Sequence, residues 1–237
     1  MSSFKQRSYQ KELLDRTDIP FEDIKRNMQE LDFINCKLGG HEITLDGIVA
    51  LIKNQMVFNS KLKIVEIGCG GGDNLRAIKR WAAHVHLDVE LEGIDVNPEC
   101  IGYAKEQKEN SGIDFIQSDY KEVNFQSKPD IIFSSLFCHH FTEEELIFMM
   151  KWMNQNSELG FFINDLHRHP LAYHSIKVLT RLFSKSYLVK NDAPLSVKRG
   201  FKRNEWDFIL NEAGIANFKC QWRWAFRWLI TCSNANQ

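Results

Sequence analysis

Three closely spaced glycines, Gly68, Gly70 and Gly72, begin the part of this sequence that could carry chemistry. They follow an apolar run at 63–67, typical of a buried strand, and precede a segment at 74–83 with the pattern of a helix. Glycine adopts positive φ angles and lets a ligand approach the backbone, and the first turn of a helix offers unpaired N–H groups. The spacing therefore predicts a nucleotide-binding turn.

Three acids lie close to this turn in the predicted sheet. Glu66 stands just before the glycines, Asp95 ends a second predicted strand, and Asp119 follows a third. Because the carboxyl ends of parallel strands meet at one edge of a sheet, we expect the three side chains in one crevice. Asp95 could accept both hydroxyls of a ribose, or it could cap the helix that begins at Pro98. A crevice with three acids suits a ligand with a cationic sulfonium, an amine, an adenine amino group and a free ribose.

Four histidines follow the fourth and fifth predicted strands at the same edge. His139 and His140 come after the fourth strand, and His167 and His169 stand just after Asp165 at the end of the fifth. Histidine changes charge near neutral pH, so each could be a base for a phenol or alcohol, although packing or capping is an equally good interpretation. Alternation along an extended segment would place Asp165, His167 and His169 on one side. Two histidines and one aspartate without a second carboxylate pair favour no metal site.

Apolar periodicity predicts the elements that position these residues. We expect two or more helices within 1–60, followed by strands that alternate with helices, which indicates a parallel sheet with right-handed crossovers. A last helix and two aromatic-rich strands within 218–232 would close the sheet. The expected fold is α/β, with a Rossmann-like, seven-stranded, mostly parallel sheet and helices on both faces. The predicted strands are 63–67, 89–94, 114–117, 131–134 and 161–164, and the helices between and after them are 74–83, 98–108, 143–153 and 204–213.

Residues 167–203 hold nine lysines or arginines and one acid, Asp192. Several apolar residues of this segment can share one face of a helix, so we expect a basic helical lid after the fifth strand. It could be a solvated helix face, or a lid whose apolar side covers an aromatic or lipid-like acceptor. Its charges would then meet a carboxylate, an acyl-carrier protein or an anionic membrane surface. We do not expect a nucleic-acid partner, because no recognised nucleic-acid module accompanies the segment. The apolar residues are Leu171, Ile176, Leu179, Leu182 and Phe183.

The whole chain has 237 residues, a formal charge of −1 and 43% hydrophobic residues, which fits one α/β domain and disfavours disorder. Its six cysteines are scattered without a CxxC pair, which is typical of reduced thiols. No leader opens the chain and no apolar run reaches the length of a membrane span. We therefore expect a cytoplasmic protein.

The glycine turn and its acids resemble the class I S-adenosylmethionine-dependent methyltransferases. Residues 65–72 match the family's strand-E-x-G-x-G-x-G signature, and the order of motifs over 60–165 matches the family as well. The resemblance implies S-adenosyl-L-methionine as cofactor and a single methyltransferase domain, with a helical cap at 1–60, a cofactor-binding half at 61–165, the basic lid at 166–203 and closing elements at 204–237. The implied cofactor site comprises Glu66, Gly68, Cys69, Gly70, Gly72, Asp95, Val96, Ser118, Asp119, Tyr120 and Ser135.

The resemblance also implies a role for individual residues of that site. The glycines would approach the methionine portion of the cofactor, and Glu66 would support its amino end. Asp95 would bind the ribose, and Asp119 would meet the adenine amine. Val96 and Tyr120 are expected to form walls for the adenine ring.

Residues 133–141, around the end of the fourth strand, limit the class of acceptor that the resemblance implies. Family members that methylate base amines or glutamine carry an Asn/Asp-Pro-Pro-aromatic run there, whereas this chain has Phe-Ser-Ser-Leu-Phe-Cys-His-His-Phe. That run resembles small-molecule methyltransferases of quinone and natural-product biosynthesis. We predict O-methylation of a small aromatic or polyketide-like acceptor. The alternatives are C-methylation of a quinone or lipid-like acceptor, a nicotinamide-dependent oxidoreductase, and a non-catalytic cofactor-binding protein that docks an anionic partner. The candidate catalytic residues are His140, His139, His167 and Asp165.

Overall fold

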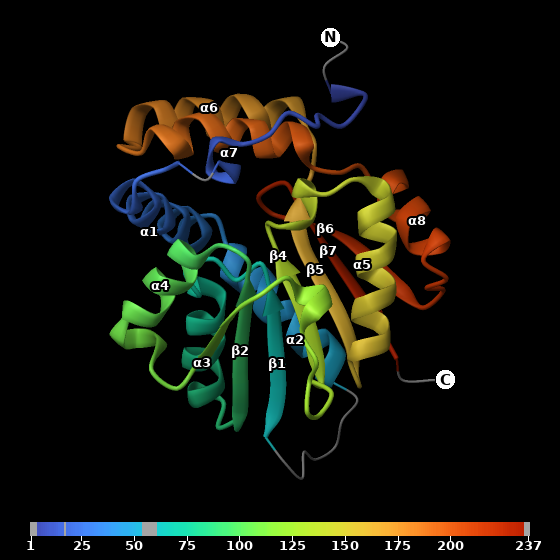
Figure 1. The fold of residues 1–237 in the computed structure, drawn as a ribbon. Helices are drawn as coiled ribbons and strands as arrows, with labels where there is room; N and C mark the ends of the chain where they lie inside the picture. The colour runs from blue at the N-terminus through green and yellow to red at the C-terminus, as the bar shows by residue number, and fades with distance from the viewer. Residues whose placement is uncertain (1–3, 17, 54–60, 235–237) are drawn as a thin grey trace.

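A seven-stranded sheet forms the centre of the computed structural model, which describes residues 4–16, 18–53 and 61–234 (Figure 1). The strand order is β3-β2-β1-β4-β5-β7-β6. The first five strands are parallel, and β7 runs antiparallel to both β5 and β6. This confirms the predicted fold class and the closing antiparallel pair. The strands are β1 Leu62–Ile67, β2 Val89–Asp95, β3 Asp114–Gln117, β4 Ile131–Ser135, β5 Gly160–Leu166, β6 Phe218–Arg223 and β7 Arg227–Ser233.

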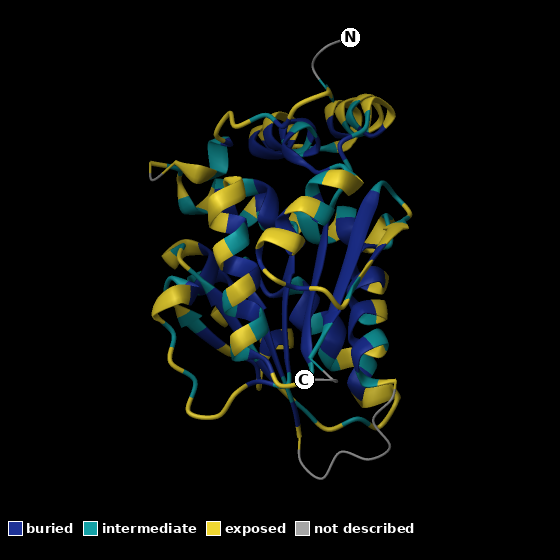
Figure 2. Cartoon of the chain, turned by 90° about the vertical axis from the view of Figure 1, so that its right-hand side faces the viewer, coloured by how far each residue is buried: buried dark blue, intermediate teal, exposed yellow. Residues whose placement is uncertain are grey.

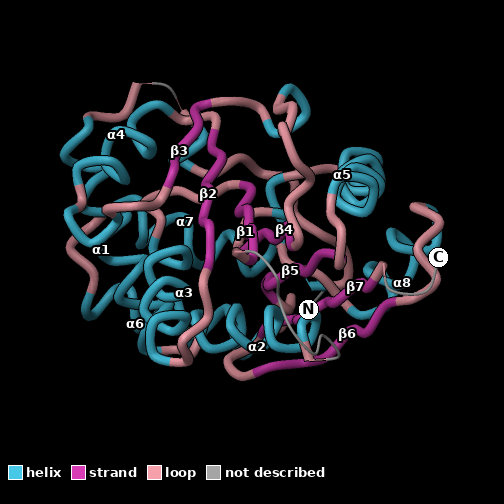
Figure 3. Tube along the Cα trace, turned by 90° about the horizontal axis from the view of Figure 1, so that it is seen from below, coloured by secondary structure: helices cyan, strands magenta, loops and turns pink. Residues whose placement is uncertain are grey.

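Helices cover both faces of the sheet because consecutive strand residues point to opposite sides (Figure 3). Ile64 packs in a core layer with α2, α3 and α4, whereas Val65 packs in a layer with α5 and α8. The strands β1, β4, β5 and β7 are almost wholly buried between these layers, whereas β3 and β6, at the two edges of the sheet, are more exposed (Figure 2). The α-helices are α1 Phe21–Lys37, α2 Gly40–Ile52, α3 Asp73–His84, α4 Pro98–Glu106, α5 Glu143–Asn156, α6 Pro170–Phe183, α7 Tyr187–Arg199 and α8 Arg203–Glu212.

Short 3₁₀ helices lie at the ends of several of these elements. The helix η2, Leu13–Asp15, belongs to the N-terminal segment, and η5, Cys138–His140, follows β4 directly. Two others, η3 Lys108–Asn110 and η4 Tyr120–Glu122, lie on either side of β3. Of these, η2 and η5 matter most for the site, because both contact α7 above the carboxyl ends of the strands.

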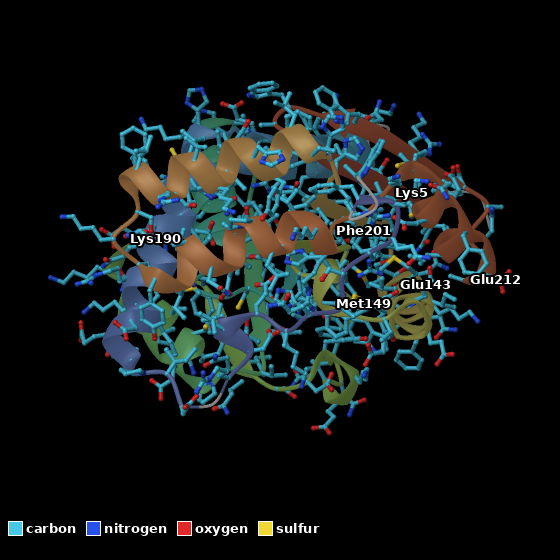
Figure 4. All side chains as sticks on the ribbon, turned by 90° about the horizontal axis from the view of Figure 1, so that it is seen from above. Lys5, Glu143, Met149, Lys190, Phe201 and Glu212 are labelled. Carbon is cyan, nitrogen blue, oxygen red and sulfur yellow. The ribbon has the colours of Figure 1, made fainter. Side chains whose placement is uncertain are left out.

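The basic segment forms two helices, α6 and α7, which lie side by side across the carboxyl-end edge of the sheet (Figures 1 and 4). Pro170 begins α6, and Ser186 caps α7 by accepting the N–H of Val189. The apolar face expected to cover an acceptor is turned outward for most of its length, since Leu171 and Leu182 are exposed. Two of the nine basic residues, Arg168 and Arg199, are buried inside the protein.

Among the described residues, every helix is too short or too polar to cross a lipid bilayer.

Candidate functional site

The glycine turn connects β1 to α3 at the point where the sheet order reverses, between β2 and β4. The N–H groups of Gly68 and Cys69 both donate to the Ile94 carbonyl, which ties the turn to β2. Gly68 has φ +71°, and a Cβ added there would lie 2.3 Å from a ring carbon of Phe137. At Gly70 the nearest atom to an added Cβ is the sulfur of Met28, at 3.4 Å. Space for a ligand at the turn is therefore greatest above Gly70.

Glu66 lies on β1 beneath the turn and is 1% exposed. Its Oε1 accepts a hydrogen bond from Asn74 Nδ2 at 2.8 Å, whereas its buried Oε2 has no partner among the described residues. Burial, together with the charge of Asp73, raises the pKa of this carboxyl well above its usual value of 4.5. A cationic group placed beside Oε2 would satisfy that oxygen and favour the carboxylate.

Asp95, at the end of β2, holds the turn in place. Its Oδ2 accepts the N–H of Gly70 at 2.9 Å, and its Oδ1 accepts the N–H of Asn97 at 2.9 Å. Burial raises the pKa of Asp95, although these two N–H groups oppose the shift. The helix-capping role belongs to Asn97, which accepts the N–H groups of Glu99 and Cys100. Asp95 is thus available at the ligand edge.

The residues after β3 divide between the crevice and the core. The N–H of Ser118 donates to the Asp95 carbonyl, which brings Ser118 and Asp119 beside Asp95. Asp119 Oδ1 accepts the N–H of Lys121 and is half-buried. Tyr120 instead packs edge-to-face on Trp152, with ring centroids 5.1 Å apart, in the layer that holds α5. Its ring therefore contributes to the core and does not form a wall of the crevice.

The other predicted cofactor residues differ in exposure. Val96 is 60% exposed beside Asp95, where an apolar side chain in solvent can meet a ligand ring. Cys69 is buried: a Cβ added to Gly93 would lie 2.8 Å from its Sγ, so the thiol points under the turn. Ser135 is buried at the end of β4, directly before Leu136, whose φ is +52°.

His139, the middle residue of η5, is buried in a network of charged residues. Its Nδ1 lies 2.8 Å from Asp165 Oδ1, and its backbone N–H donates to Asp165 Oδ2 at 3.2 Å. Its Nε2 lies 3.5 Å from Glu12 Oε1 of the N-terminal segment. Burial alone would lower the pKa of His139, but the charges of Asp165 and Glu12 outweigh it and raise the pKa to about 9. His139 is therefore a cation at neutral pH.

His140 lies beside His139, with ring centroids 4.5 Å apart, and it is partly exposed. Its Nδ1 is 3.1 Å from Asp15 Oδ1, so a proton on Nδ1 is donated to that carboxylate. Its charge acts on the pKa of Asp95, and its ring lies 6.3 Å from Phe137, which covers Gly68. Of the four histidines at this edge, His140 thus joins the histidine network to the glycine turn.

Asp165 and His167 do not form the expected pair, because the Asp165 carboxylate is bound by His139. His167 lies with His169, at 5.5 Å between ring centroids, and with Trp228, at 5.0 Å. It lines a separate cavity of about 480 Å³, and its buried Nδ1 has no partner among the described residues. Burial and the charges of neighbouring cations lower the pKa of His167 to about 4.

The sequence pattern missed several residues that complete this site. Glu12 and Asp15 come from a segment without strand, glycine or motif signals, and no local pattern could have identified them. Arg199 Nε donates to the carbonyl of His139 at 3.0 Å and lies 3.9 Å from Glu12 Oε1. Phe137 shows in the sequence only as one apolar residue among others.

Among the residues that the structure describes, two groups of side chains have the spacing to hold a metal ion. Glu12, His139 and His140 offer three ligand atoms within 4.8 Å of one another. Asp32, His41 and Asp73 form the second such group, next to the glycine turn. In the first group, Ser196 donates to Glu12 Oε1 at 2.7 Å and Arg199 lies close by, so ion pairs and hydrogen bonds already engage that carboxylate.

Residues 64–160 match the family described as "Methyltransferase domain". Malonyl-[acyl-carrier protein] O-methyltransferase of Acetivibrio thermocellus is 28% identical over 85 residues, which are 35% of this chain and 28% of that relative. The match thus spans little more than a quarter of the length of this curated relative.

Solved structures with the same fold include three methyltransferases. One of Aquifex aeolicus, described as dependent on S-adenosylmethionine, has a TM-score of 0.61 at 15% identity and covers 91% of this chain and 99% of its own. Human N-acetylserotonin methyltransferase with S-adenosylmethionine has a TM-score of 0.63 at 16% identity, and the match covers 90% of this chain and 56% of the human chain. Magnesium protoporphyrin IX methyltransferase of Synechocystis with S-adenosylhomocysteine has a TM-score of 0.55 at 16% identity, with 86% and 87% covered.

Proposed function

We propose that this chain, a class I S-adenosylmethionine-dependent methyltransferase by its matched domain and its fold, methylates an oxygen atom of a small aromatic or polyketide-like acceptor. One observation carries the proposal. Glu66, Asp95 and His140 converge on a single glycine turn from the ends of three adjacent strands. The acids suit a cationic cofactor, and the histidine lies where an acceptor would approach it.

The residues of the turn fit S-adenosylmethionine. The buried Oε2 of Glu66, which has no partner among the described residues, would be matched by the cofactor's ammonium group, and the room above Gly70 would accept its chain. Asp95 and Asp119 stand at the ends of β2 and β3 for the ribose and the adenine amine, with Val96 beside them. When bound, the cofactor supplies an electrophilic methyl group for an in-line displacement.

Glu66 has a second consequence for cofactor binding. Its raised pKa favours the protonated carboxyl in the free protein, whereas an ammonium group beside it favours the carboxylate. Cofactor binding would therefore lower the pKa of Glu66 and release a proton wherever the free carboxyl is protonated, and affinity would rise with pH over that range.

His140 is the proposed base. Asp15 holds its Nδ1 proton, and Nε2, which lies 3.8 Å from Glu12 Oε2, is the ring nitrogen that would accept the proton of a phenol or alcohol as the new bond forms. His139 is unsuited to that task, because with a pKa of about 9 it already carries a proton. It acts as a positioning residue, since its contacts with Glu12 and Asp165 fix η5 and hence His140.

Calorimetry with S-adenosylhomocysteine tests the cofactor site. We expect binding by the wild-type protein and about 10- to 100-fold weaker binding by Asp95→Ala and by Glu66→Gln. Glu66→Gln should also abolish the proton release, measured as the dependence of the binding enthalpy on the buffer. Absence of binding by the wild-type protein, or undiminished binding by Asp95→Ala, would sink the proposal.

Transfer of a labelled methyl group to a panel of phenols and hydroxylated aromatic acids tests the base. His140→Gln should lower turnover by about 10²- to 10⁴-fold and leave S-adenosylhomocysteine affinity unchanged. His167→Gln is the matched control and should change neither quantity. Product analysis by NMR separates methylation of oxygen from methylation of carbon. Equal turnover by His140→Gln and the wild-type protein would mean that positioning alone accounts for catalysis.

We also propose that the reaction takes place in the cytoplasm and that the basic segment docks an anionic partner. All six cysteines are free thiols, which suits a reducing compartment. The similarity to a malonyl-[acyl-carrier protein] O-methyltransferase supports a carrier-bound acceptor as one form of that partner. An anionic membrane surface is the other form.

A further inference from the structure

The outer face of α6 carries a line of exposed apolar side chains. Leu171, Val178 and Leu182 are 57%, 56% and 68% exposed, and their spacing of seven and four residues places them along one side of the helix. Ala172 and Thr180, on the opposite side, are buried against the protein. The helix therefore turns its most apolar stripe toward solvent, the reverse of an ordinary surface helix.

Basic residues flank this stripe. Lys177 and Arg181 lie along one side of it, and Lys185 follows the end of the helix; all three are exposed. Phe183, 77% exposed, and Leu179 widen the apolar stripe on the other side. The resulting surface, which we call the α6 face, combines apolar side chains with positive charge.

The segment that forms the α6 face contributes no acidic side chain to it. Between Asp165 and Glu205 the chain has a single acid, Asp192, which is buried and accepts the N–H groups of Leu13 and Leu14. The nearest carboxylate from α1, that of Glu30, accepts the N–H groups of Lys185 and Ser186. Positive charge on this face is thus left without an acidic partner from its own helices.

The positive surface continues beyond the N-terminal end of α6. The cavity that holds His167 and His169 is also lined by Lys5 and Lys202, and its lining contains no acid. Lys5 and Lys202 form no ion pair among the described residues. Figure 4 shows Lys5 close to this end of the two lid helices and Lys190 at the other end.

We propose that the α6 face lies flat on an anionic lipid surface, with its apolar stripe in the acyl boundary and its lysines and arginines among the headgroups. This deepens the proposed function, on which it rests, by naming the partner of the basic lid.

Two other occupants fit the α6 face less well. A second copy of the chain would bring an equally basic face against it, and like charges repel. An acidic protein would satisfy the charges, but it would need a groove to receive an apolar line that projects from a convex helix. The line runs along a helix of 14 residues, about 21 Å long, which matches a flat surface better than a pocket.

Sedimentation with lipid vesicles tests the inference. We expect the wild-type protein to sediment with vesicles of phosphatidylglycerol and phosphatidylcholine in equal parts, and not with phosphatidylcholine alone. Binding should weaken as salt is added, because exposed charges are screened. Equal binding to both kinds of vesicle would overturn the electrostatic part of the proposal.

Variants locate the contact. Lys177→Gln with Arg181→Gln should weaken vesicle binding about 30-fold, because each charge near an anionic surface contributes on the order of a fivefold effect. Val178→Asp with Leu182→Asp should weaken it by about tenfold or more. Val85→Asp is the matched control: Val85 is 47% exposed and directly follows α3, at the opposite end of the sheet, so its substitution should leave binding unchanged.

Calorimetry with S-adenosylhomocysteine on the same proteins separates the two proposals. If every variant binds this ligand as the wild-type protein does, then a loss of vesicle binding reports on the α6 face alone. Failure of the wild-type protein to bind anionic vesicles, with ligand binding intact, overturns the membrane proposal only. Saturable binding to a purified acyl-carrier protein without vesicle binding, or a dimer abolished by Leu182→Asp, would assign the face to one of the other occupants instead.

Discussion

His139 and His167 stand beyond the ends of neighbouring strands, on the same edge of one sheet, and yet their proton affinities differ by several orders of magnitude. The pKa of His139 is raised to about 9, and that of His167 is lowered to about 4. Both rings are removed from water to some degree, and burial alone would lower both pKa values. The difference therefore comes from the charges that other elements bring to each ring.

His139 meets acids, because β5 contributes Asp165 and the N-terminal segment contributes Glu12. His167 meets cations, because Arg168 and His169 follow it and Lys202 approaches from the start of α8. The edge of the sheet is thus divided into an acidic half, next to the glycine turn, and a basic half, next to the lid and α8. A cationic cofactor suits the first half, and an anionic partner suits the second.

Removal of the acid at His139 should produce the largest effect. Both oxygens of Asp165 accept N–H groups, Oδ1 from His139 Nδ1 and Leu166 and Oδ2 from the backbone of His139. Asp165→Asn would turn an NH₂ group toward one of these donors and leave the histidine cation buried without its nearest counter-charge. We expect the free energy of unfolding to fall by about 3–5 kcal/mol, measured by denaturant titration.

Asp119→Asn is the control for that experiment. Asp119 also stands just beyond a strand end, but it is half-buried and accepts one N–H group, from Lys121. Its substitution should change the free energy of unfolding by less than about 1 kcal/mol. A similar loss of unfolding free energy for both variants would show that the buried network around His139 contributes no more to stability than a half-buried aspartate does.

Removal of Glu12, the second acid at His139, should lower the free energy of unfolding by less than removal of Asp165. In Glu12→Gln the amide can still accept from Ser196, but the negative charge near His139 Nε2 is lost. We expect a loss of about 2 kcal/mol at neutral pH. The raised pKa of His139 contributes stability that is fully present below pH 6.5 and is lost as pH rises through about 9. Over that pH range the free energy of unfolding of Glu12→Gln should therefore fall by less than that of the wild type. An unchanged alkaline loss would contradict the assigned partner. Glu143→Gln, on the exposed first turn of α5, is the control, and its free energy of unfolding should equal that of the wild type at each pH.

The sequence predicts those parts of the site whose residues lie close together in the chain. Glu66, the glycines and Asp95 lie within one strand-turn-helix-strand unit, so spacing alone brought them together. Glu12 lies 127 positions before His139, and its place depends on how the N-terminal segment packs across η5 and α7. Periodicity likewise predicted an apolar face on α6, but Leu171 and Leu182 of that face are exposed, and the buried residues of the helix are Ala172 and Thr180. Which side is buried follows from the tertiary structure.

The free energy of unfolding measured as pH falls should depend on His167, in the basic half of the edge. His167 has a folded pKa of about 4 against an ordinary value of 6.5, so the unfolded chain binds the proton first as pH falls. Its contribution is present above pH 6.5 and is lost as pH falls toward about 4. His167→Gln should therefore lose about 1 kcal/mol less than the wild type between these limits, after allowance for solvent screening. Denaturant titrations at both pH values measure the difference, and identical acid limbs would contradict the depressed pKa.

The smallest expected effect concerns a single cation near His167. Lys202 lines the same cavity, and its charge lowers the pKa of the ring after burial, His169 and Arg168. Lys202→Gln should raise the pKa of His167 by about 0.5, measured from the pH dependence of its ring resonances. Lys190→Gln, at the far end of the lid, is the control and should leave that pKa unchanged (Figure 4). The same titration in Lys202→Gln should leave His139 near a pKa of about 9, because the acids of its own half hold it there. If the Lys202 substitution moved both histidines equally, the two halves of the edge would share one electrostatic environment, and the division between them would be wrong.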